Sequence, residues 1–352
     1  MDLNLAASAV DWAAGHIKKS GRNLLNIHFF GGEPFVAPEV VDVAVNRARH
    51  TAAKLGLIAR FEITTNGVFN GNRARFVGDY FDTVVLSFDG TEKYHDRHRP
   101  VNKCRGSFAN VSDTAVNLSR SPTELCFRTC ISDYNVAQME KTAVWFCESF
   151  RPSIINFETL KSTKASKSAG LNPPDPYSFA VHCMRACRIV ESYGIGAVYA
   201  ASVLHEPRYS FCPVGKDTLI LSPDGHISSC YLPQQEWLKK GLDLDVGRFE
   251  NDGSVRINMN SIKNLRRMVS MKPKCTNCFC RWTCAGGCHV ENTPPGCSSE
   301  YNDFCIQTRI ITACRLLDRM GYDNFSDALM KNVSAMQKLA LQPTDCLIRQ
   351  NR

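Results

Sequence analysis

The residues of this sequence that are best suited to chemistry are cysteines at metal-ligand spacing. Their pattern is C-x2-C-x5-C-x3-C with one further cysteine, at Cys275, Cys278, Cys284, Cys288 and Cys305. Thiolates of this kind bind zinc or iron-sulfur clusters. Because few apolar residues lie between 272 and 295, bound metal must supply much of the folding free energy there.

A further pair of cysteines, Cys212 and Cys230, lies upstream. Between them, residues 218–230 read TLILSPDGHISSC, which is typical of a β-hairpin with Pro223, Asp224 and Gly225 as its turn. Such a hairpin holds Cys230 at a fixed offset from Cys212. The seven spaced thiolates overfill a tetrahedral zinc site and nearly fill two four-iron clusters.

The stretch HFFGGEP, residues 28–34, places two glycines and an acid directly after an apolar segment. Glycines let a ligand approach the backbone closely, and the Glu33 carboxylate can pair with an ammonium group. The stretches ITTNG and LSFDG end two later apolar segments. They place Asn66, Ser87 and Asp89 at the ends of these segments, where the three side chains could contact the same ligand. Taken alone, each of these residues could equally be a turn or cap residue.

Short apolar segments alternate with helical patterns over the first half of the chain. Strands are predicted at Leu24–Phe30, Ala59–Thr65, Thr83–Phe88, Glu124–Ile131 and Ile154–Glu158. Helices are predicted at Pro38–Lys54, Ser107–Leu118, Asn135–Phe150 and Tyr177–Ser192, with a long loop at 159–176. This order predicts a parallel sheet, open or curled into a barrel, with both faces covered and ligands at the carboxyl ends of the strands.

The composition is typical of a cytoplasmic globular protein. The 352 residues are 44% hydrophobic, which is enough for a sizeable core, and the 17 cysteines favour metal or redox chemistry in a reducing compartment. The net charge is +8, but the basic residues are spread along the chain and no nucleic-acid-binding motif accompanies them. No segment has the continuous apolar run of a membrane span or a secretory signal. We therefore expect neither nucleic acid nor a membrane as a partner.

These motifs resemble those of radical S-adenosylmethionine (SAM) enzymes that carry a SPASM domain. The resemblance runs from about Met1 to Leu317 and rests on GGEP, on the two later strand ends and on the cysteine spacing. It implies an α/β fold in which residues 1–205 form a partial (β/α)6 radical SAM barrel. Residues 206–320 would form a small cysteine-rich SPASM domain with a β-hairpin and a C-terminal helix, and residues 321–352 a helical extension and tail.

The resemblance also implies two auxiliary [4Fe-4S] clusters. The ligands that it implies are Cys212, Cys230 and Cys288 for the first cluster, and Cys275, Cys278, Cys284 and Cys305 for the second. Relatives with a complete first cluster usually have another cysteine shortly after the position of Cys212, and the stretch PVGKDTLI has none. The first cluster is therefore expected to keep an open iron site for a substrate thiol, or to take a ligand from Cys280 or Cys297.

By the same resemblance, SAM is bound at the strand ends. The implied contacts are Gly31, Gly32, Glu33, Pro34, Asn66, Ser87 and Asp89. An intact parent would reduce SAM to a 5'-deoxyadenosyl radical that abstracts hydrogen from a substrate carbon. It would need an electron donor such as a flavodoxin or a ferredoxin.

One motif of the family does not occur in this sequence. The reductive [4Fe-4S] cluster is bound by C-x3-C-x2-C after the first barrel strand, and the thirty residues before Gly31 contain no cysteine. Because Met1–Lys19 resembles the first barrel helix, we interpret the chain as truncated at its N-terminus, with the first strand missing. Such a fragment would be inactive, and its strand from Leu24 would be an unpaired edge.

The resemblance implies a maturase that modifies peptides or proteins. A sulfatase-maturating relative carries an aspartate after the hairpin cysteine, where this sequence has Tyr231, so crosslinking of a ribosomally made peptide is favoured. Tyr231 is a weak candidate for a catalytic acid or base, with a packing role as the simpler interpretation. One alternative is a non-catalytic iron-sulfur protein that binds a peptide partner, and another is a zinc-binding interaction module.

Overall fold

The computed structural model describes residues 1–102, 105–212, 218–250, 254–266, 272–292 and 300–343. Cys104, Cys297, Cys346 and the tail from Thr344 lie outside these residues. Within the described ranges, no helix is long and apolar enough to cross a membrane.

A parallel sheet of six strands organises the first half of the chain. In spatial order the strands are β1 (Leu24–Phe29), β2 (Ile58–Thr65), β3 (Thr83–Ser87), β6 (Glu124–Ile131), β7 (Ile154–Thr159) and β8 (Gly196–Val198). The first five confirm the predicted strands and the α/β fold class. The sequence pattern does not predict β8, because three residues are too few for a period-two signal. In the described part of the chain, β1 and β8 are the edge strands, so the strand from Leu24 is a sheet edge as expected.

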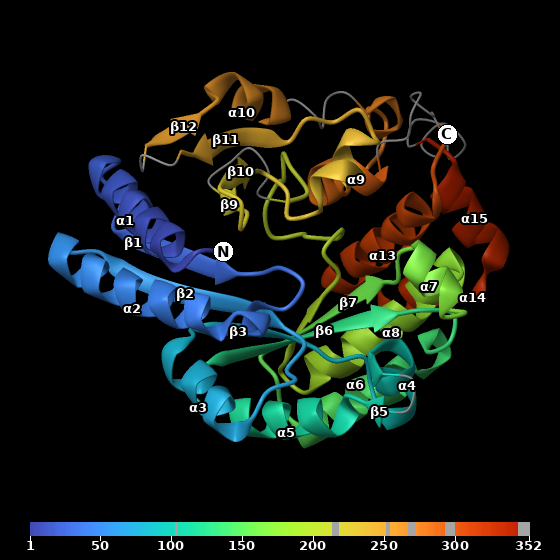
Figure 1. The fold of residues 1–352 in the computed structure, drawn as a ribbon. Coiled ribbons are helices and arrows are strands. Elements are labelled where there is room, and N and C mark those ends of the chain that lie inside the picture. The colour runs from blue at the N-terminus through green and yellow to red at the C-terminus, as the bar shows by residue number, and fades with distance from the viewer. Residues whose placement is uncertain (103–104, 213–217, 251–253, 267–271, 293–299, 344–352) are drawn as a thin grey trace.

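Helices follow the outer face of this sheet, as Figure 1 shows. The longer ones are α1 (Leu3–Lys19), α2 (Pro38–Leu55), α3 (Gly71–Tyr80), α5 (Phe108–Leu118), α6 (Met139–Ser149) and α8 (Pro176–Ser192). Helix α2 has Pro38 in its first turn and ends at Gly56, whose left-handed backbone suits glycine. The predicted helices therefore form, although the one predicted from Asn135 begins as a short 3-10 turn, η2 (Val136–Gln138).

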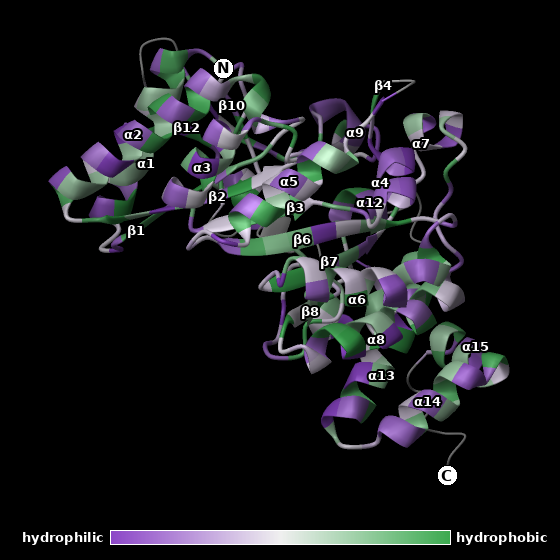
Figure 2. Ribbon diagram, turned by 90° about the horizontal axis from the view of Figure 1, so that it is seen from below, coloured by the Kyte–Doolittle hydropathy of each residue, from purple (hydrophilic) through white to green (hydrophobic). Residues whose placement is uncertain are grey.

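Strand side chains alternate between an apolar outer face and a polar inner face. Ile63, Leu86 and Phe127 are completely buried in the core between the sheet and its helices. Arg128 and Glu158 alternate with such residues and stay partly exposed. Figure 2 shows the largely hydrophobic strands β6 and β7 in the middle of the molecule, among helices of mixed colour. The sequence predicts that both faces of the sheet are covered. Helices cover the outer face as predicted, whereas the inner face carries polar side chains.

Short elements join the strands near their carboxyl ends. They are η1 (Pro34–Val36), α4 (Glu92–His98), β4 (Pro100–Asn102), β5 (Arg105–Gly106) and α7 (Lys164–Ser168). Helix α7 lies within the segment that the sequence predicts to be a loop. A reciprocal capping box between Thr163 and Ser166 starts it, which explains why so short a helix forms.

A second, antiparallel sheet follows and lies above the first in Figure 1. Its spatial order is β12 (Val255–Ile257), β11 (Asp245–Phe249), β10 (His226–Ser228) and β9 (Ile220–Leu221). Strands β9 and β10 confirm the predicted hairpin. Helices α9 (Gln234–Leu238) and α10 (Met259–Arg266) accompany this sheet. Trp12 of α1 packs edge-on against Phe249, with ring centres 5.7 Å apart, and so connects the two sheets.

The cysteine-rich segment and three helices complete the described chain. The short elements are η4 (Pro273–Cys275), α11 (Arg281–Cys284) and α12 (His289–Asn292). The C-terminal helices are α13 (Asp303–Arg319), α14 (Asp323–Lys331) and α15 (Val333–Leu341). Helix α13 confirms the helix predicted around Cys305. Arg188 of α8 donates to Asp318 and Asp327, which fixes α13 and α14 against the first domain.

Candidate functional site

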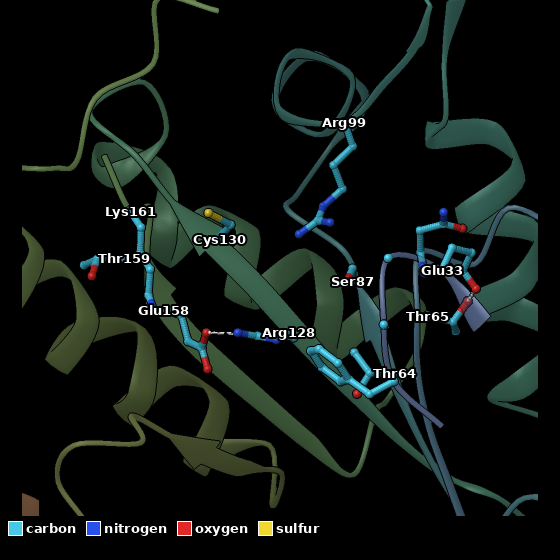
Figure 3. A pocket seen from close by; sticks show the side chains of 14 residues that line it. Glu33, Thr64, Thr65, Ser87, Arg99, Arg128, Cys130, Glu158, Thr159 and Lys161 are labelled. Atoms are coloured by element: carbon cyan, nitrogen blue, oxygen red, sulfur yellow. Dashed lines mark hydrogen bonds and ion pairs between the residues drawn. The ribbon is translucent and has the colours of Figure 1, made fainter. Parts of the chain in front are cut away.

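A cavity of about 310 Å³ opens at the carboxyl ends of strands β1, β2, β3, β6 and β7 (Figure 3). Five of the seven predicted cofactor residues line it: Gly31, Gly32, Glu33, Asn66 and Ser87. Pro34 lines a neighbouring groove, and Asp89 lies behind the cavity wall. The parallel sheet therefore gathers residues from separate strands into one site, as the position of strand ends predicts.

Glu33 is held in place by the end of the neighbouring strand. Its Oε1 accepts a hydrogen bond from the Thr65 hydroxyl at 2.8 Å, and its Oε2 accepts one from the Asn66 backbone N–H at 2.7 Å. It also caps η1 by accepting from the Phe35 N–H at 3.3 Å. The carboxylate thus caps η1 and lines the cavity at once, and its role as a cofactor contact stays a prediction.

The two glycines leave open space beside Glu33. A Cβ atom at Gly31 or Gly32 would meet no other atom within 4 Å, and Gly31 has a backbone φ of 155°. The bare backbone therefore borders a space that the protein itself does not fill. This is the arrangement that a ligand bound to backbone groups requires.

Two arginines bring positive charge to the opposite wall, and the sequence analysis missed both as site residues. Arg128 of β6 pairs with Glu158 of β7 at 2.5 Å, and both line the cavity. Arg99 lines it as well. A charged residue inside the apolar strand ELCFRTCI is the signal that could have revealed Arg128, because such a residue must face a polar space.

Asp89 positions Arg99. Its carboxylate is buried and accepts from Arg99 Nε at 2.7 Å and from the Cys130 N–H at 2.8 Å, with His98 Nδ1 at 3.4 Å. Burial alone would raise the pKa of Asp89, but the charge of Arg99 and the hydrogen bonds from His98 and Arg99 hold that pKa well below its usual range. Asp89 is therefore charged at neutral pH and holds a cation at the cavity wall.

The four cysteines assigned to the second cluster line one small cavity. They are Cys275, Cys278, Cys284 and Cys305. All four are free thiols, and three come from a stretch of ten residues that has few apolar neighbours. Burial, and then the proximity of the other three thiols, raises the pKa of Cys284. A donor set of four converging thiols fits an iron-sulfur cluster.

The cysteines assigned to the first cluster also lie together, at the edge of the second sheet. Cys212, Cys230 and Cys288 all pack against its core. Burial raises the pKa of Cys230 to about 11, and the nearby Cys288 and Cys212 thiols add to that rise. Cys280 lies with the other set, beside Cys278, and Cys297 is outside the described residues, so neither is a described ligand here.

Tyr231 follows Cys230 and lies between this set and the cavity. Its ring contacts that of Phe30 at a tilt of 41°, with centres 4.3 Å apart, and Phe30 is a cavity residue. Burial raises the pKa of the Tyr231 phenol to about 12. This ring contact agrees with the packing role that the sequence favours.

Among the described residues, no three His, Cys, Asp or Glu side chains are close enough together to hold one metal ion.

Comparisons with known proteins agree with this geometry. No protein-family model matches the chain. The serine-type anaerobic sulfatase-maturating enzyme of Klebsiella aerogenes is 22% identical over 307 residues, which are 81% of this chain and 72% of that enzyme. Native anSMEcpe with bound AdoMet superposes with a TM-score of 0.66 at 17% identity, over 91% of this chain and 90% of that one.

Streptococcus suis SuiB bound to S-adenosylmethionine matches with a TM-score of 0.52 at 14% identity, over 81% of this chain and 66% of SuiB. The chain therefore shares its fold with anSMEcpe and SuiB. Structures also exist of anSMEcpe with AdoMet and a Kp18Cys peptide, and of SuiB with the precursor peptide SuiA. In this shared fold, the cavity at the strand ends and the two thiol sets are the candidate functional site.

Proposed function

We propose that this chain is a peptide- or protein-modifying maturase of the radical SAM/SPASM type, and that its substrate is a ribosomally made peptide. One observation carries the proposal. A single cavity presents the Glu33 carboxylate on one wall and the guanidinium groups of Arg128 and Arg99 on the other. The methionine part of SAM carries an ammonium group and a carboxylate, which these charges complement.

The roles of the cavity residues follow from their chemistry. Glu33 and the open backbone at Gly31 and Gly32 would hold the ammonium group, and Arg128 the carboxylate. Ser87 and Asn66 offer hydrogen bonds to ribose hydroxyls. Asp89 acts through Arg99, so we assign it a positioning role. When bound, SAM supplies the radical precursor, and the protein supplies orientation.

The thiol sets would hold two auxiliary [4Fe-4S] clusters, which bind substrate or carry electrons. The first set has three described thiols, which are Cys212, Cys230 and Cys288. Three thiolates leave one of the four irons without a protein ligand, and this iron would be the open site for a substrate thiol. The 352 residues contain no C-x3-C-x2-C motif for a reductive cluster, so no residue here is assigned to one. A flavodoxin or a ferredoxin is the expected class of electron donor. Translation of the DNA upstream of Met1 tests for the motif directly.

A peptide substrate fits a second cavity of about 320 Å³ that adjoins the first. It lies between the end of β1 and the β9–β10 hairpin and shares Phe30 and Gly31 with the SAM cavity. Tyr231 and Trp237 line it. The peptide complexes of the relatives support this choice over the non-catalytic alternative.

The proposal is tested by SAM binding to anaerobically reconstituted protein, measured by calorimetry. We expect binding that S-adenosylhomocysteine competes for, and about tenfold weaker binding for Arg128→Met, since one charged hydrogen bond is lost. Arg60→Met, on strand β2 of the same sheet but outside the cavity lining, is the control. Iron and sulfide analysis should give about eight irons per chain, as expected for two clusters. Absence of SAM binding, or zinc without iron, would contradict the proposal.

A further inference from the structure

Arg309 of helix α13 is the largest of the completely buried side chains, with 1% of its surface exposed. Its guanidinium lies 4.7 Å from the centre of the Phe279 ring and 4.4 Å from that of Tyr301. Every described hydrogen bond that it donates goes to a sulfur or to a backbone carbonyl, and none to a carboxylate. A buried cation in such surroundings calls for negative charge from another source.

One of these hydrogen bonds reaches a predicted cluster ligand. Arg309 Nη1 lies 3.2 Å from Cys278 Sγ, and Cys278 belongs to the four cysteines that share one cavity. A thiolate at Cys278 supplies the missing negative charge at hydrogen-bond distance. Hydrogen bonds between charged groups are stronger than those between neutral ones.

The other hydrogen bonds reach the end of helix α15. Nε and Nη2 donate to the Leu339 carbonyl at 3.1 and 2.8 Å, and Nη2 also donates to the Gln342 carbonyl. The last carbonyls of a helix lack intrahelical partners and form the negative end of its dipole. Arg309 therefore caps α15 and contacts Cys278 with the same guanidinium.

We propose that Arg309 couples the C-terminal helix α15 to the second auxiliary cluster and raises the reduction potential of that cluster. The inference rests on the proposed function, which supplies the cluster. Reduction adds negative charge to a cluster that four thiolates already make negative, and a fixed N–H···S hydrogen bond favours the added charge. Because the last carbonyls of α15 hold the guanidinium in place, a change at the end of α15 alters the reduction potential of the cluster without changing any of its ligands.

The first test is a redox titration of the reconstituted protein with dithionite, followed by electron paramagnetic resonance. The signal that Cys284→Ser removes is assigned to the second set. For Arg309→Met we expect unchanged iron content and about a tenfold loss of electron affinity, which is a shift of about 59 mV to more negative potential for one electron. Arg315→Met is the matched control, because Arg315 lies on the same helix and donates to Glu191 and the Ala197 carbonyl instead.

A second test changes α15 and leaves Arg309 intact. Ala340→Pro disrupts the last turn, where the carbonyls that accept from Arg309 lie, and should shift the potential in the same direction. Val333→Pro is the control, since proline is tolerated in the first helical turn. By reciprocity, cluster loading should slow amide exchange in the last turn of α15 in the wild-type protein.

The outcomes separate this inference from the proposed function. A wild-type protein that takes up no iron defeats the proposed function itself. Clusters with the same potential in wild type, Arg309→Met and Ala340→Pro overturn the inference and leave the proposed function standing. If Arg309→Met loses its iron, Arg309→Lys and the exchange measurement decide: an α15 whose exchange does not respond to cluster loading overturns the coupling.

Discussion

The cavity at the strand ends and the cysteine-rich segment differ in what holds their functional groups in place. At the cavity, Glu33 is fixed by Thr65 and Asn66, and Arg128 by Glu158, so partners within the protein orient each group. Between Lys272 and Asn292, all of them described residues, Val290 is the one buried apolar side chain that is neither alanine nor cysteine. The cavity residues are held by a sheet with a hydrophobic core, whereas few apolar side chains hold the cysteines.

This difference indicates two ways of building a site. The cavity is preorganised, because its hydrogen bonds exist before a ligand arrives. Burial, and then the neighbouring thiols, instead raise the pKa values of Cys284 and Cys230, which disfavours their charged forms until a metal binds them. Ligand removal should therefore leave the first region folded and unfold the second.

Removal of iron is the largest test of this contrast. Chelation should lower the free energy of local opening between residues 272 and 292 by more than about 5 kcal/mol, because metal binding there is folding free energy. Strands β2, β3 and β6 should keep their protection. Native-state hydrogen exchange of loaded and iron-free protein measures both regions at once. Equal protection of 272–292 in the two states would show that the segment is preorganised like the cavity.

The buried Asp89 tests the other side of the contrast. Asp89→Asn should lower the free energy of unfolding by about 3–5 kcal/mol at neutral pH, because Arg99 then lacks its buried partner. Denaturant unfolding measures this, with the exposed Asp113→Asn as control.

The same variant has a pH dependence with a defined sign. The pKa of Asp89 is lowered in the fold, so the unfolded chain binds the proton more readily as the solution becomes acidic. The stability that Asp89 contributes is therefore complete above the ordinary aspartate pKa of about 3.9 and declines below it. The difference between wild type and Asp89→Asn should shrink below about pH 4. A constant difference down to that range would exclude a charged Asp89 as its source.

The sequence predicts the parts of this molecule that depend on local pattern. Apolar runs locate β1, β2, β3, β6 and β7, and a turn motif locates the β9–β10 hairpin. Strands β8 and β12 escape prediction because three residues are too few for a period-two signal, and β11 (DVGRF) escapes it because its apolar residues do not alternate strictly. Asn135, where the sequence predicts a helix to begin, does not cap it: its Oδ1 accepts from the Ser132 N–H, and its Nδ2 donates to the Cys130 carbonyl.

The site follows the same division. Glu33 and the thiol sets are found from spacing, because motif residues lie close together along the chain. Arg99 and Arg128 become site residues only when the fold brings the end of α4 and strand β6 to the wall opposite Glu33. The link from Arg309 to Cys278 and to the end of α15 joins three distant segments, and no spacing rule along the chain contains it.

Glu33→Gln sharpens the cavity side of the comparison. The amide keeps the shape of the side chain but loses its charge, so we expect SAM affinity to fall about 10- to 100-fold, as for one charged hydrogen bond. Stability should change little, because one amide oxygen can still accept from Thr65 or Asn66. Calorimetry with SAM measures the affinity, and the exposed Glu39→Gln is the control. An unchanged affinity would exclude Glu33 from the ammonium site.

Thr65→Val gives the smallest effect and tests preorganisation itself. Thr65 is buried at the cavity lining, and its hydroxyl donates to Glu33 at 2.8 Å. Loss of this hydrogen bond frees Glu33 to adopt other rotamers and should weaken SAM binding about fivefold, equivalent to about 1 kcal/mol. If Thr65 acts only through Glu33, the double variant Glu33→Gln/Thr65→Val binds SAM as weakly as Glu33→Gln alone. Additive losses would mean that Thr65 contacts the cofactor independently, and the cavity would then be less preorganised than its hydrogen bonds indicate.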